Sequence, residues 1–238
     1  MIDQDREMLR SARLAGAMYL LGDTMLEVGN LITSRIAGEG SFIDIAHRIA
    51  SAEGQYRLGL ACQIVTTLSL IWLAVSFYSI LKRVDPKIAL VAMLAWIVES
   101  GLSALINLFD FLSLRMSLNA TKPGADVAQL TALGDLADRA SGLAFNLGVI
   151  VFSMGSILFY ALFLKSRYLP RAIAGFDLLA SALVLLVGFA RLLDPVLAKS
   201  LGFGFIPMSI AEFGTGLWLL IVGTRIPPMR TSTADRAA

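Results

Sequence analysis

The sequence has few of the side chains with which soluble enzymes and metal proteins do chemistry. Its 238 residues include one cysteine, Cys62, and one histidine, His47. A single cysteine excludes an internal disulfide and a cysteine-based zinc site, and a single histidine excludes a haem held by two histidines of this chain. A hydrolase based on Ser-His chemistry would have only His47 as its base. We therefore expect no cofactor, no metal site and no catalytic residue.

Charge is scarce as well, and it is nearly balanced. Charged residues make up 16% of the chain, with 20 Lys and Arg against 18 Asp and Glu, and no basic run is long enough to follow a nucleic-acid backbone. We therefore expect no nucleic-acid partner. Apolar residues are abundant instead, at 57%, and the mean hydropathy of +0.74 lies above the range of soluble domains. This composition indicates an integral membrane protein whose surroundings are a lipid bilayer.

Six apolar stretches are long enough to cross a bilayer, which takes about 20 residues in a helix. They cover residues 14–36, 58–81, 88–112, 143–164, 172–193 and 205–224. The predicted fold class is all-α integral membrane, with six transmembrane helices in one bundle over residues 13–226. An N-terminal segment, 1–12, precedes the bundle, and a disordered tail, 227–238, follows it.

Two amphipathic stretches outside these spans, 41–55 and 125–142, predict short helices on the outer face of the membrane. Ser41 and Asp44 have the spacing of a capping box at the start of the first of them. The second stretch follows a loop between 113 and 125, marked by Pro123 and Gly124, and it can also run directly into the fourth span.

The basic residues indicate which side each end of the bundle faces. Six spans place both termini on the same side. Twelve of the 20 Lys and Arg lie before the first span, in the short links 82–87 and 165–171, or after the last span, whereas eight are spread over the longer connecting segments. Because short cytoplasmic loops carry the excess of Lys and Arg, both termini are predicted to be cytoplasmic.

Four patterns of glycine, aromatic and apolar residues follow one another along the chain. They read RLAGAMYLLG at 13–22, YRLGL at 56–60, YLPRAIAGF at 168–176 and AEFGTGLWLLIVG at 211–223. In this order and spacing, from about residue 10 to 228, the chain resembles a bacterial membrane family catalogued as domain of unknown function 4386. The resemblance implies a multi-pass protein of the bacterial inner membrane, and it supplies no activity, ligand or catalytic residue.

Polar residues form a stripe on two of the predicted spans. Glu99, Ser103, Asn107 and Asp110 fall within an arc of about 80° at 100° per residue, and the first span carries its own polar stripe. An acid near the bilayer centre costs a few kcal/mol if it faces hydrocarbon, so these stripes are expected to face the bundle interior. No Lys or Arg lies at the depth of Glu99, so it would either take up a proton or hold a cation or a ligand amine.

The candidate site is therefore a polar cavity between the helices, open toward the outer face. Arg57 and Arg191, at the outer ends of their helices, are expected to pair with acids of neighbouring helices. The predicted site residues are Glu99, Asn107, Asp110, Asp23, Glu27, Glu212, Arg57 and Arg191.

Three functions remain open at this stage. The leading hypothesis is binding or transport of a small molecule or a cation in this cavity, with a lipid as a further kind of ligand. The alternative is a structural or accessory membrane protein, in which the buried acids only specify how the helices pack. A membrane-embedded enzyme comes third. A continuous polar cavity favours the first, a tightly packed bundle the second, and two carboxylates poised against a serine or a water the third. The sequence leaves the oligomeric state open.

Overall fold

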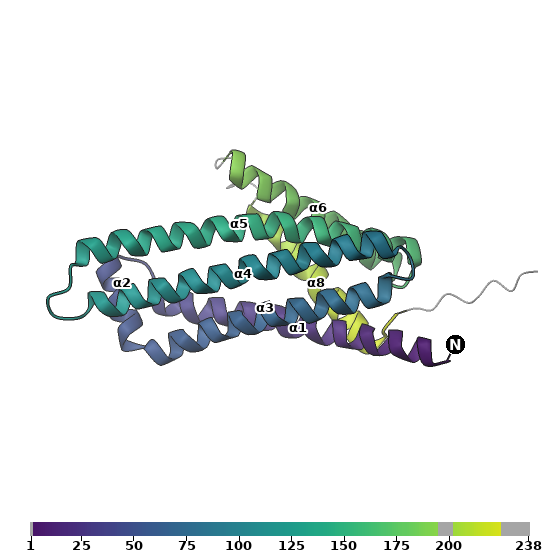
Figure 1. The fold of residues 1–238 in the computed structure, drawn as a ribbon, viewed down its shortest axis with the longest axis horizontal. Coiled ribbons are helices and arrows are strands. Elements are labelled where there is room, and N and C mark those ends of the chain that lie inside the picture. Colours follow the sequence, from purple (N-terminus) through teal and green to yellow (C-terminus); the bar gives the residue numbers. More distant parts are fainter. Residues whose placement is uncertain (1, 195–201, 225–238) are drawn as a thin grey trace, which may run out of the picture.

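The computed structural model describes residues 2–194 and 202–224, and these are almost entirely α-helical (Figure 1). The tail predicted at 227–238 lies outside the described residues. A short 3₁₀ turn, Gly202–Gly204, precedes the last helix. The helices are α1 (Ile2–Ala37), α2 (Phe42–Ser51), α3 (Glu53–Leu81), α4 (Pro86–Ala120), α5 (Val127–Ser166), α6 (Arg171–Leu193) and α8 (Phe205–Ile221).

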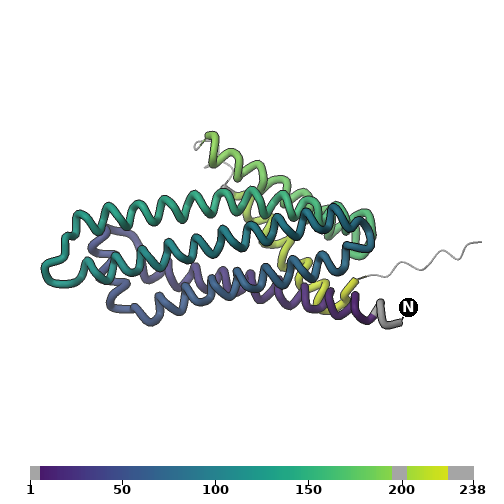
Figure 2. The backbone as a smooth tube through the Cα atoms, viewed as in Figure 1, coloured from purple at the N-terminus to yellow at the C-terminus, as the bar shows by residue number. Residues whose placement is uncertain are grey.

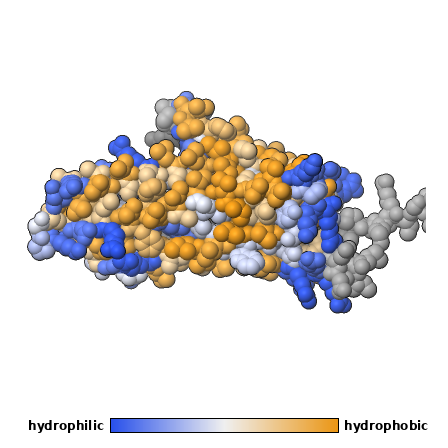
Figure 3. Space-filling model, viewed as in Figure 1, coloured by the Kyte–Doolittle hydropathy of each residue, from blue (hydrophilic) through white to orange (hydrophobic). Residues whose placement is uncertain are grey.

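Four of the described helices, α3, α4, α5 and α6, are long and apolar enough to cross a membrane. This agrees with a membrane protein. The 17-residue α8 is apolar but shorter, and the acids of α1 keep that helix out of the group despite its 36 residues. Figure 3 shows a wide hydrophobic band around the middle of the molecule with hydrophilic residues gathered at both ends. Such a band is what a helical bundle presents to lipid.

Helices α4 and α5 extend well past the predicted spans 88–112 and 143–164. The loop predicted between 113 and 125 shrinks to the turn 121–126, because no helix-breaking residue comes before Pro123. Asp126 then starts α5 by accepting a hydrogen bond from the Gln129 backbone N–H at 3.0 Å. The amphipathic stretch 125–142 is therefore the first part of α5 and not a separate helix. With 35 and 40 residues, these helices measure about 52 and 60 Å, against a hydrocarbon core of about 30 Å.

The capping box predicted at α2 is confirmed. The Asp44 backbone N–H donates to the Ser41 hydroxyl oxygen at 3.4 Å, and the Ser41 backbone N–H donates to the Asp44 carboxylate at 3.3 Å. Arg48 of α2 donates to the Ala37 carbonyl at 2.9 Å, which ties α2 to the end of α1. His47 of α2 is exposed.

Glycines let the helices approach closely at two contacts that shape the bundle. A Cβ on Gly16 of α1 would lie 2.6 Å from the Gly216 carbonyl oxygen of α8. A Cβ on Gly155 of α5 would lie 2.6 Å from the Trp96 ring of α4. Real side chains do not tolerate such distances, so these glycines allow α1 to pack on α8 and α5 to pack on α4.

One half of the bundle is filled by aromatic side chains from α1, α3, α4 and α5. Phe77 lies at the centre of the group, edge-on to Phe159 at 5.3 Å and to Phe163 at 5.0 Å between ring centroids, and it also contacts the other three rings. We call this group the aromatic cluster; it consists of Tyr19, Phe77, Trp96, Phe159, Tyr160 and Phe163, each no more than 2% exposed. It lies toward the end of the molecule that carries the N-terminus and the links 82–87 and 165–171 (Figure 2).

Candidate ligand-binding cavity

A cavity of about 760 Å³ lies between the helices. It adjoins the aromatic cluster on the side away from the N-terminus. It is lined by residues of six helices: α1, α3, α4, α5, α6 and α8. Its lining includes six carboxylic acids but no Lys, Arg or His of the described chain. The acids are Asp23 and Glu27 from α1, Glu99 and Asp110 from α4, Asp138 from α5 and Glu212 from α8.

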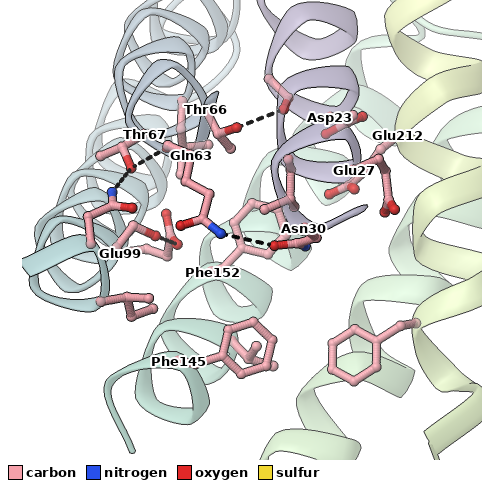
Figure 4. A pocket seen from close by; sticks show the side chains of 18 of the residues that line it. Asp23, Glu27, Asn30, Gln63, Thr66, Thr67, Glu99, Phe145, Phe152 and Glu212 are labelled. Atoms are coloured by element: carbon pink, nitrogen blue, oxygen red, sulfur yellow. Dashed lines mark hydrogen bonds between the residues drawn. The ribbon is translucent and has the colours of Figure 1, made fainter. Parts of the chain in front are cut away.

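The structure brings six of the eight predicted site residues onto this one cavity: Asp23, Glu27, Glu99, Asn107, Asp110 and Glu212. The helical period accounts for this on each of the two stripes. Residues three or four apart lie on one face of a helix, so both stripes turn inward once their helices pack side by side. The acids and amides therefore share a cavity although they come from different helices (Figure 4).

Two carboxylates at the inner end of the cavity are incompletely paired. Glu99 accepts a hydrogen bond from the Ser103 hydroxyl at 2.7 Å through Oε1. Its other oxygen, Oε2, is buried and meets no hydrogen-bond donor of the described chain. The same holds for Oδ2 of Asp23. Buried polar atoms are almost always hydrogen-bonded, so two open oxygens on one cavity indicate a place where a partner can bind.

Glu212 adds a third acid at this inner end. It lies close enough to Asp23 and Glu99 to interact with both electrostatically. Nevertheless, no three His, Cys, Asp or Glu side chains of the described residues come together closely enough to share one metal ion. The acids are thus spread over the cavity wall rather than gathered into a compact cage for one ion.

The middle of the cavity is polar but uncharged. The Asn107 amide donates to the Thr67 hydroxyl at 3.2 Å, and the Gln63 amide donates to the Asn30 side-chain oxygen at 3.2 Å (Figure 4). The Thr66 hydroxyl donates to the Gly22 carbonyl at 3.0 Å, which joins α3 to α1. Gln63, Thr66 and Thr67 are not among the predicted site residues, because the span 58–81 reads as a purely apolar one. Their spacing on one helical face could have revealed them.

The outer end of the cavity lies toward α2 and the turn 121–126. Asp110 accepts a hydrogen bond from the Ser141 hydroxyl of α5 at 3.0 Å and is half-buried. Asp138, one turn from Ser141, is exposed, as are Glu27 and Asn30 on α1. Because the residues near the aromatic cluster are buried and these are exposed, the cavity opens at the end opposite the cluster. Asp138 and Ser141 were missed because 125–142 was assigned to a helix outside the bundle.

Arg57 and Arg191 do not belong to the cavity, and the predicted pairing of Arg57 with an acid of another helix is wrong. Arg57 pairs with Glu53, four residues earlier in α3, at 2.7 Å, and both side chains are at least 40% exposed. An acid one turn away is the nearest partner available to a helical arginine. The Arg191 guanidinium lies 4.8 Å from the ring centroid of Phe205, and no acid of the described residues pairs with it.

Aromatic rings complete the wall of the cavity. Phe145 and Phe152 of α5, Phe205 of α8 and Tyr19 of α1 line it. Phe152 stacks on Trp96 at 5.2 Å between ring centroids, with 16° between the ring planes, which fixes its orientation at the inner end. Two of these rings, Phe145 and Phe205, already face the Arg191 guanidinium, which lies 5.7 and 4.8 Å from their centroids.

Comparison with known proteins gives a family and no activity. Residues 14–223 match the family model described as Domain of unknown function (DUF4386). No curated protein and no solved structure matched the chain.

Proposed function

Since the chain belongs to this family, whose description contains no activity, we propose a function from the cavity: a multi-pass membrane protein that binds a small cationic molecule between its helices. One observation carries the proposal. The cavity has six acidic side chains and no basic one in its lining, and two buried carboxylate oxygens, on Asp23 and Glu99, have no hydrogen-bond partner in the described chain.

Electrostatics favour a cation over other ligands at this site. Charges interact more strongly away from water, so carboxylates that share a buried cavity repel one another and gain from a cation between them. An anion would meet the same repulsion, and an uncharged apolar molecule would leave the open oxygens of Asp23 and Glu99 unpaired at a cost of about 1–3 kcal/mol each.

The volume and the spread of the acids favour an organic cation over a bare metal ion. A cavity of about 760 Å³ has the size of a site for a small organic molecule. The described residues supply no group of three ligands for one metal ion. An ammonium group with an apolar body would place its charge on carboxylates and its carbon atoms on Phe145 and Phe152.

The structural alternative has less support. If the buried acids only joined helices, their oxygens should meet donors from neighbouring helices, as Asp110 meets Ser141. Glu99 instead accepts its one hydrogen bond from Ser103 of its own helix. An enzyme has no specific observation in its favour, because that serine–carboxylate contact is a local bond within α4.

The proposal includes a topology of six crossings, with α1 and α8 joining α3, α4, α5 and α6, in the bacterial inner membrane. The inward polar stripe of α1 supports its crossing, because its opposite face is free to meet lipid. The N-terminus and the links 82–87 and 165–171 lie at one end of the molecule, and α2 lies at the other (Figures 1 and 2). The positive-inside rule assigns the first end to the cytoplasm, so that α2 and the mouth of the cavity face outward.

A thermal-unfolding screen in nanodiscs of zwitterionic lipid tests the function. Benzylamine and benzyl alcohol have the same shape and differ in charge, so benzylamine should raise the melting temperature and benzyl alcohol should not. Glu99→Gln should reduce the shift, because the amide keeps the size of the side chain but not its charge. Asp135→Asn, at an exposed position of α5 outside the cavity lining, should leave it unchanged. Equal responses to the two ligands, or no response to any amine, would exclude the proposal.

A further inference from the structure

The acids of the cavity lie at two levels along α4. Glu99 lies at the inner level, near Asp23 and Glu212, and Asp110 lies at the outer level. Asp110 is close enough to Asp138 of α5 to interact with it electrostatically. Between the two levels, the residues of α4 on the cavity are the uncharged Ser103 and Asn107 and the apolar Ile106.

The distance between the levels follows from helix geometry. Glu99 and Asp110 are eleven residues apart on one helix, which gives about 16 Å along the axis at about 1.5 Å per residue. Both side chains incline toward the N-terminus of α4, so their carboxylates keep a similar separation. The cavity is therefore elongated, with negative charge at both ends.

From this arrangement we infer that the ligand is an elongated α,ω-diamine, with one ammonium group at the level of Glu99 and the other at the level of Asp110. The inference rests on the proposed function and names the ligand class of the same site. A charge-assisted hydrogen bond from nitrogen to a carboxylate oxygen measures about 2.8 Å, which leaves about 10–11 Å between the two nitrogens. The inner ammonium meets the open oxygen Oε2 of Glu99, and the outer one meets Asp110 and Asp138.

The walls between the two levels fit the middle of such a molecule. Leu70 of α3 and Val149 of α5 are apolar and line the cavity. An extended carbon chain can lie against these side chains and pass Asn107 and Thr67, which keep their hydrogen bond to each other. A compact cation can occupy only one of the two acidic levels at a time, whereas an extended diamine neutralises both.

Three probes separate the second charge from length and from hydrophobicity. An extended chain advances roughly 1.25 Å per bond, so 1,8-diaminooctane spans about 11 Å between nitrogens and 1,3-diaminopropane only about 5 Å. 8-Amino-1-octanol has the length of the first and a single charge. Binding is measured by calorimetry in zwitterionic nanodiscs. We expect 1,8-diaminooctane to bind about fivefold more tightly than either other probe. This gain in affinity is what one partly exposed ion pair contributes.

Two variants assign the two ends of the ligand. Asp110→Asn should lower the affinity for 1,8-diaminooctane to that for 8-amino-1-octanol and leave the amino alcohol unaffected. Glu99→Gln should weaken the binding of both 1,8-diaminooctane and 8-amino-1-octanol, because each places an ammonium group at the inner level. Asp135→Asn, outside the cavity, serves as the control and should change neither.

The outcomes distinguish this inference from the proposed function. If 8-amino-1-octanol binds as tightly as 1,8-diaminooctane, or Asp110→Asn affects both equally, the two-ended ligand is wrong while cation binding stands. If 1,3-diaminopropane binds as tightly as 1,8-diaminooctane, the spacing argument is wrong. If none of the three amines binds the native protein, both proposals are wrong.

Discussion

The hydroxyl oxygens of Tyr19 and Tyr160 lie 2.7 Å apart and join α1 to α5 inside the aromatic cluster. Tyr19 also lines the cavity, so this hydrogen bond lies at its closed end. Both side chains are no more than 2% exposed. The pair thus links α1 to α5 through two residues that are 141 positions apart in the chain. It lies at the boundary between the cavity and the aromatic cluster.

Removing one hydroxyl of this pair should destabilise the fold. Tyr19→Phe leaves the Tyr160 hydroxyl without this partner, with the Asp177 carboxyl of α6 as its remaining polar neighbour. Tyr160→Phe removes the partner of the buried Tyr19 hydroxyl. We expect each variant to lose about 1–3 kcal/mol of unfolding free energy. The double variant should lose less than the sum, because neither hydroxyl then remains. Denaturant titration in detergent measures all three, and strict additivity would mean that the two hydroxyls do not interact.

A second buried hydrogen bond makes a similar prediction in the neighbouring helices. The Thr215 hydroxyl of α8 donates to Oδ2 of Asp177 in α6 at 2.6 Å, and both side chains are fully buried. Thr215→Val keeps the volume but removes the donor, so it should lower the unfolding free energy by about 1–3 kcal/mol. Thr215→Ser retains the hydroxyl and should be the milder change. Equal losses in the two variants would attribute the effect to packing instead.

The close contact of α1 with α8 predicts a strong effect at one glycine and none at another. Gly16→Ala places a methyl group against the backbone of α8 near Gly216, so the two helices must separate and the melting temperature should fall. Gly214→Ala in α8 meets nothing within 4 Å and should be neutral or slightly stabilising. The same thermal-unfolding assay compares them, and an unchanged melting temperature for Gly16→Ala would contradict the packing.

The cap of α2 makes a prediction about pH. The hydroxyl and the backbone N–H of Ser41 both donate to Asp44, and they lower the pKa of its carboxyl below the usual range. A lowered pKa means that the contribution of the cap is complete above the ordinary aspartate pKa and is lost as the pH falls through the lowered value. In an NMR titration in micelles, Ser41→Ala should return the Asp44 pKa toward its ordinary value. No movement would assign the shift to another cause.

Cysteine labelling tests the topology. In a Cys62→Ser background, cysteines introduced at Ser51 in α2 and at Ser166 in the link after α5 should label differently with an impermeant thiol reagent on intact cells. The position in α2 should react and the other should not, because the two lie at opposite ends of the molecule. Preferential labelling at position 166 would reverse the proposed orientation.

The sequence predicts well what depends on a single helix. Glu99, Asn107 and Asp110 share a face because of the helical period alone, and the capping box of Ser41 and Asp44 is equally local. Both stripes were therefore expected to face inward before any packing was known, and the structure places them on one cavity.

The contacts between helices could not be predicted in the same way. Which side chain faces Asn107 depends on the rotation and relative height of α3, and nothing in a single sequence specifies that the partner is Thr67. The same applies to Ser141 and Asp110. The error at Arg57 had a different origin, since distant acids were considered and the local partner Glu53 was overlooked.

The aromatic cluster has an electrical consequence in a bilayer. If the cavity is open to water at one end only, the electrical potential of that side extends into it. Most of the membrane voltage would then fall across the packed rings between Tyr19 and the links 82–87 and 165–171. Moving one charge through the full voltage involves about 2.3 kcal/mol per 100 mV. A cation that travels from the mouth to Glu99 would therefore experience little of this voltage. Any passage beyond Tyr19 would experience nearly all of it, so the two steps would differ sharply in their response to membrane potential.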